Sequence, residues 1–84
     1  MEASLSPEVN KEIESLIMRC DKVLNCHSLK TRKIGNQKAI EVHIMVDEDM
    51  KMKDVDVVQE SVEQCLKEKY GSGTHVIVKV EPFK

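Results

Sequence analysis

The chain has 84 residues, the length of one small domain with a single modest core. Its 13 lysine and arginine residues and 15 acidic residues give a formal charge of −2, and only Tyr70 and Phe83 are aromatic. Nucleic-acid-binding domains use basic faces and aromatic stacking platforms, so the composition argues against that class. No apolar run is longer than three residues. A membrane-spanning helix needs about 20, so we expect none here.

The N-terminus and the cysteines indicate the compartment. The first residues lack the basic and apolar segments of a signal peptide. The three cysteines are an odd number without a C-x-x-C pair, unlike the disulfide framework of a secreted protein. We therefore expect a soluble domain in the reducing cytoplasm, with residues 1–6 as a tail and residues 7–84 as one domain.

The first half of the chain predicts a helix followed by a β-hairpin. Ser6 is a good N-cap and Pro7 suits the first helical position, and an apolar stripe then continues to about Cys20. Residues 21–26 break the pattern. Residues 29–34 and 38–47 are expected to be strands, joined through Gly35 and Asn36, which tolerate the positive φ of a tight turn.

The second half predicts another helix and a third strand. Residues 54–70 have an apolar stripe at helical spacing and end at Gly-Ser-Gly, and residues 74–81 alternate as a strand. The order is α-β-β-α-β. We therefore expect a small α+β two-layer sandwich, ferredoxin-like and metallochaperone-like, with two helices on one face of a three-stranded sheet. The other face stays open, which favours self-association in so small a fold.

Strand parity places most of the chemically active side chains on the open face. From the second and third strands these are Glu41, His43, Met45, His75, Ile77, Lys79 and Glu81. If the strands pair directly, His43 and Glu81 come within reach of each other, whereas parity leaves the facing of His27 open. Imidazole nitrogen and carboxylate oxygen together suit an ion such as Zn²⁺. Solvated surface histidines are the simpler interpretation of these residues alone.

Four segments carry a recognisable family pattern. They are residues 27–32 (HSLKTR), 42–47 (VHIMVD), 62–63 (VE) and 76–82 (VIVKVEP). In this order and spacing the set resembles the cytosolic C-terminal domain of cation diffusion facilitator transporters, the zinc-efflux family. The resemblance implies the same α-β-β-α-β fold and a V-shaped homodimer that binds divalent metal near its interface. It also implies that metal draws the two lobes together and favours transport through the transmembrane domain of the parent transporter.

The resemblance points to four metal-binding positions, His27, His43, Asp56 and Glu81. Lys79 departs from the family pattern, because several metal-binding members have a histidine there that is shared between two ions. A protonated lysine cannot be a ligand and repels a cation, so we expect one ion per protomer or a site of different composition. We expect Zn²⁺ or another divalent transition metal.

Several alternatives stay open at this point. Cys20 and Cys65 are expected to pack in the core, whereas Cys26 is a candidate soft ligand beside His27, although neighbouring strand residues point to opposite faces. His75 has no family match. We expect no enzymatic activity, because neither an activated nucleophile nor a phosphate-binding glycine loop is present. The alternative function is a metal-independent dimerisation scaffold of the same fold.

Overall fold

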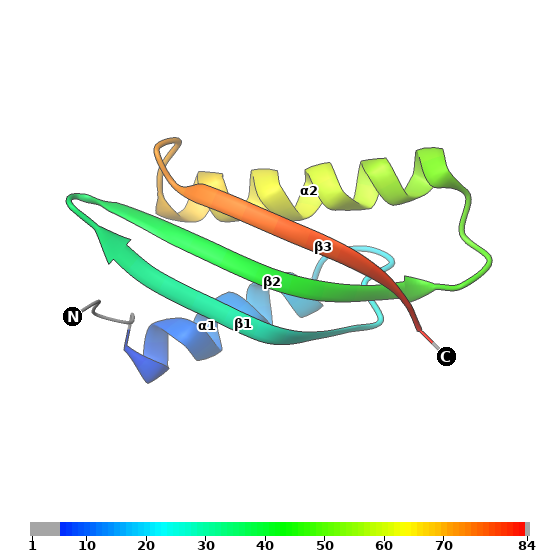
Figure 1. The fold of residues 1–84 in the computed structure, drawn as a ribbon, viewed down its shortest axis with the longest axis horizontal. Coiled ribbons are helices and arrows are strands. Elements are labelled where there is room, and N and C mark those ends of the chain that lie inside the picture. The colour runs from blue at the N-terminus through cyan, green and yellow to red at the C-terminus, as the bar shows by residue number, and fades with distance from the viewer. Residues whose placement is uncertain (1–5, 84) are drawn as a thin grey trace.

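The computed structural model describes residues 6–83, which form two helices and three strands. Their order is α1 (Pro7–Met18), β1 (Asn25–Ile34), β2 (Gln37–Asp47), α2 (Met52–Tyr70) and β3 (His75–Phe83). The strands form one sheet in which β2 is central, antiparallel to β1 and parallel to β3. Both helices lie behind the sheet in Figure 1, on the same face. The predicted two-layer α-β-β-α-β sandwich is confirmed.

The helix ends follow local sequence signals. The Ser6 hydroxyl accepts a hydrogen bond from the Val9 backbone N–H at 3.2 Å, so Ser6 is the N-cap of α1. Helix α1 ends at Met18, so Cys20 follows the helix instead of closing its last turn. Helix α2 begins two residues earlier than expected and ends at Tyr70, followed by the C-cap Gly71, whose φ of 109° suits only glycine well.

The core lies between the sheet and the helices. Alternate residues of β2 face the helices, and the buried apolar set is Ile13, Ile17, Val23, Ile40, Val42, Ile44, Val46, Val58, Val62, Leu66 and Val78. The intervening residues of β2 lie on the opposite, open face. Within residues 6–83, neither helix is long and apolar enough to cross a membrane.

The strands differ from the expected ones mainly at the beginning of β1. This strand starts at Asn25, inside the segment expected to break the pattern, and the Leu24 N–H donates to the Met45 carbonyl at 2.8 Å. The hairpin turn has the expected place, but only Gly35 has positive φ there (59°), not Asn36. Strand β3 runs to Phe83, two residues further than predicted.

Candidate metal centre

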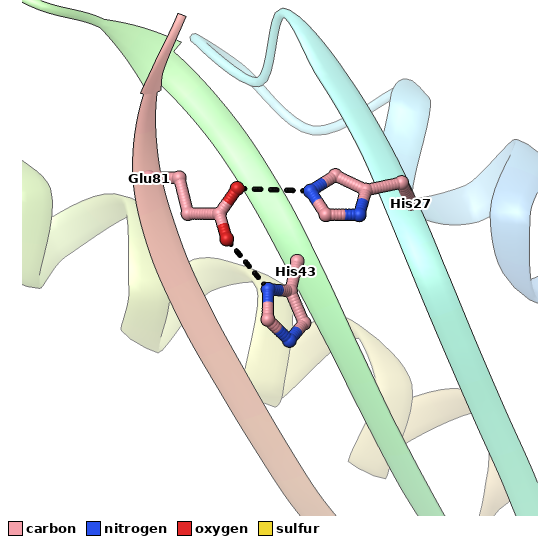
Figure 2. A group of neighbouring side chains, drawn as sticks. All are labelled: His27, His43 and Glu81. Carbon is pink, nitrogen blue, oxygen red and sulfur yellow. Dashed lines mark hydrogen bonds and ion pairs between the residues drawn. The ribbon is translucent and has the colours of Figure 1, made fainter.

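Three polar side chains, one from each strand, meet on the open face of the sheet. His27 on β1 is the Cα partner of His43 on β2, and Glu81 on β3 is the partner of Met45, two residues beyond His43. Figure 2 shows the three side chains converging, with one carboxylate oxygen of Glu81 directed at each imidazole ring. Residues separated by up to 54 positions in the chain are thus brought together by sheet register.

The three side chains are joined by short hydrogen bonds. Nε2 of His27 lies 2.9 Å from Oε2 of Glu81, and Nδ1 of His43 lies 2.7 Å from Oε1 of the same carboxylate. The two ring centroids are 5.0 Å apart with an interplanar angle of 42°. Each residue offers one ligand atom, and these atoms all lie within 4.8 Å of one another. This spacing is compact enough for one ion to contact all three after small side-chain rotations.

A β-bulge determines the facing of His27. Between His27 and Lys30 the chain of β1 advances three residues while its partner β2 advances two, from His43 to Glu41. The extra residue is accommodated at Ser28, whose φ is 56°. Without it, His27 would share the face of Thr31, which is buried against the helices. The bulge therefore transfers His27 to the open face.

The bulge also supplies a further contact, which the sequence did not predict. The Ser28 hydroxyl lies 2.8 Å from Nδ1 of His27, the ring nitrogen that faces away from Glu81. A serine in the left-handed region gives no signal in composition or periodicity. Only the pairing register of β1 with β2 reveals the bulge, and with it the contact between Ser28 and His27.

Glu81 is held as a carboxylate. Hydrogen bonds from His43 and, second, from His27 lower the pKa of Glu81 below its ordinary value. The side chains of His27, His43 and Glu81 are 43%, 24% and 37% exposed, so an ion from solvent can reach them. Two imidazoles and one carboxylate form a donor set that suits zinc, and three protein ligands leave a fourth position open. The residues present therefore fit a divalent metal.

The other candidate residues lie elsewhere. Asp56 is exposed on α2, in the helix layer, and does not join the group. Cys26 pairs with Ile44 and packs against the core, so it faces away from His27. His75 pairs with Ala39 toward the opposite end of β3, whereas Lys79 is the exposed Cα neighbour of His43 on the open face.

The comparison with protein families decides what this domain is. The sequence model described as "Cation efflux protein, cytoplasmic domain" matches residues 5–83, nearly the whole chain. The chain belongs to this family. The description is that of the cytoplasmic domain of a cation efflux protein, and the name of the model, ZT_dimer, refers to dimerisation. The resemblance inferred from the four sequence segments is thereby confirmed.

Two curated relatives cover almost the whole chain. The manganese efflux system protein MneP of Bacillus subtilis is 25% identical over 83 residues, which are 99% of this chain and 28% of that protein. The cation-efflux pump FieF of Citrobacter koseri is 26% identical over 82 residues, 98% of this chain and 27% of that protein. The chain thus spans little more than a quarter of the length of these relatives.

Solved structures confirm the fold. CzrB, described in its structure report as a zinc transporter, is 26% identical, with a TM-score of 0.88 over 95% of this chain and 99% of that chain. A Zn form of CzrB gives a TM-score of 0.85 over 98% and 93% of the two chains. A nickel form of a MamM CTD variant, at 18% identity, has a TM-score of 0.84 over 94% and 100%, which supports the fold alone.

Proposed function

We propose that this cation efflux domain binds a divalent transition metal ion through His27, His43 and Glu81 and thereby regulates transport by its parent protein. What supports the proposal most is the convergence of three metal-ligating side chains from three strands, with ligand atoms within 4.8 Å. Such a meeting requires both the bulge in β1 and the parallel register of β3. The CzrB structure in a Zn form adds that a related domain of this fold takes up zinc.

Zinc is the metal that the donor set favours. Two of the three ligands are imidazoles, which suit zinc and its neighbours in the transition series, whereas manganese prefers sites dominated by oxygen. The curated relative MneP is named for manganese, so the cargo of the parent transporter and the metal of this domain need not coincide. We expect zinc to displace manganese from this domain in a direct competition.

Regulation would act through a homodimer. Metal-free, the carboxylate of Glu81 holds both imidazoles by hydrogen bonds. A bound cation would supply stronger coordinate bonds to the same atoms and would leave one coordination position for another ligand. Asp56, exposed on α2, stays a candidate for that position only from a second copy, because it lies in the helix layer of its own chain. In this way occupancy would change how two copies sit together.

A second function is favoured by one specific observation. The His27–Glu81–His43 group is already satisfied by hydrogen bonds without metal, and the cation of Lys79 neighbours His43. In a metal-independent dimerisation scaffold, the hydrogen bonds among these three side chains would only link the three strands. The two functions differ in whether the dimer responds to metal.

Small-angle scattering and sedimentation of the chelator-treated domain distinguish these functions. With zinc added in stoichiometric amount, the regulatory function predicts a dimer with a smaller radius of gyration, reversed by chelator. His75→Ala is the matched control, because it removes a histidine from the same face outside the group. A dimer whose mass and radius ignore both zinc and chelator contradicts regulation and leaves the scaffold.

A further inference from the structure

We infer that Ser28 is a positioning residue for the metal ligand His27. Its hydroxyl can hydrogen-bond with Nδ1 of His27 in either neutral tautomer, and this contact holds the ring so that Nε2 can bind metal. The inference rests on the proposed function and concerns a residue outside the three ligands. It starts from two contacts of one ring: Nε2 lies 2.9 Å from Oε2 of Glu81, and Nδ1 lies 2.8 Å from the hydroxyl of Ser28.

The metal-free tautomer follows from the chemistry of the two partners. A neutral imidazole carries one proton, and an ionised carboxylate can only accept a hydrogen bond. The proton of His27 must therefore be on Nε2, where it donates to Glu81. Nδ1 then has a lone pair, so the Ser28 hydroxyl donates to it.

Metal ligation requires the opposite tautomer. To ligate through Nε2, the nitrogen that faces Glu81, His27 must lose the proton there to solvent and gain one on Nδ1, so the ring stays neutral. Nδ1–H then needs an acceptor. A hydroxyl can rotate from donor to acceptor without moving its oxygen, whereas a carboxylate or an ammonium group in that place would fit one tautomer only.

The backbone keeps this hydroxyl in place. Ser28 is the residue with φ of 56° at the bulge, so the same local distortion that turns His27 to the open face also brings Oγ to Nδ1. Histidine ligands of metals almost always donate their second N–H to an acceptor, usually a carboxylate, a backbone carbonyl or water, and losing that partner typically weakens metal binding 10- to 100-fold. Because His27 is exposed and water can replace a lost partner, we expect the lower end of this range.

Two substitutions of Ser28 distinguish the effect of its hydroxyl from the effect of its backbone conformation. Ser28→Gly keeps the positive φ, which glycine adopts readily, and removes Oγ, so the domain should melt at the same temperature or higher. Ser28→Asn also tolerates positive φ and offers both a donor and an acceptor. Ser72→Gly, in the turn before β3, is the matched serine-to-glycine control.

The test combines zinc titration with the ¹⁵N resonances of the His27 ring, which show which ring nitrogen carries the proton, at about pH 8. We expect the proton on Nε2 without metal and on Nδ1 with zinc. Ser28→Gly should weaken zinc binding about tenfold, Ser28→Asn should restore most of it, and Ser72→Gly should bind as the parent does. Parent-like affinity in Ser28→Gly, or a zinc-loaded parent still protonated on Nε2, would overturn the role of Ser28 while leaving zinc binding intact. A parent that binds no zinc would instead overturn the proposed function itself.

Discussion

Lys79 should weaken metal binding by its charge alone, and the size of this effect can be worked out from the sheet. Lys79 is the Cα partner of His43 on the parallel strand β3, and neighbouring strands lie about 4.8 Å apart. Its side chain is exposed and extends into solvent, so we take about 8 Å between the ammonium group and the ion, in a medium close to water. A divalent ion and one positive charge then repel each other by about 1 kcal/mol, or about fivefold in affinity.

Calorimetric zinc titration of the Lys79→Gln variant tests this estimate. At about 10 mM salt, where charges act over about 30 Å, Lys79→Gln should bind zinc about fivefold more tightly than the parent. Lys79→Arg keeps the charge and should bind as the parent does. At about 1 M salt the Debye length falls to about 3 Å, so the difference should vanish. Equal affinity of the Gln and Arg variants at low salt would refute the reasoning, as would a gain that persists at high salt.

Three further predictions concern the fold and its titratable groups. Ile44→Ala removes a fully buried side chain from the central strand and should destabilise the domain by about 2–5 kcal/mol in urea unfolding, whereas Val57→Ala, 61% exposed on α2, should change stability by less than about 0.5 kcal/mol. Hydrogen bonds from His43 and His27 lower the pKa of Glu81 below 4.5, so the folded state binds this proton less readily than the unfolded chain. The stability that this carboxylate contributes is therefore present above about pH 4.5 and lost as pH falls below it. Between pH 5 and pH 3, the melting temperature of the Glu81→Gln variant should therefore decline less than that of the parent. Melting temperatures that decline in parallel would count against the hydrogen-bonded carboxylate. Burial and the neighbouring Cys65 thiol raise the pKa of Cys20 from 9.0 to about 11, so at pH 8 it should react with iodoacetamide about 100-fold more slowly than an ordinary thiol, and labelling at the ordinary rate would contradict this protected environment.

Regular alternation made most of the open face predictable from sequence. In β2 the branched apolar residues at 40, 42, 44 and 46 fix which face is turned to the helices, and His43 lies on the open face as parity indicates. Glu81 follows from the same parity in β3. Its exact neighbour does not, because the parallel register between β2 and β3 depends on the packing of α2 rather than on any turn.

His27 could not be placed by the same reasoning. In an unbroken strand His27 would lie on the same face as Thr31, which the structure buries, and the extra residue of the bulge places it on the open face instead. A bulge at a serine has no compositional marker, so the sequence predicts regular strand only from residue 29, whereas β1 begins at Asn25. Asp56, which the family resemblance suggested as a metal ligand, lies in the helix layer away from the group, so its binding of metal stays a prediction.

The most direct test of the central claim is a zinc titration by calorimetry of the chelator-treated domain and two variants. We predict saturable binding of zinc to the parent, near one ion per chain, and loss of binding in the double variant His27→Ala/His43→Ala. His75→Ala should bind as the parent does, because this residue lies outside the group. Zinc binding by the double variant with the affinity of the parent would contradict the assignment of the metal centre to these strands.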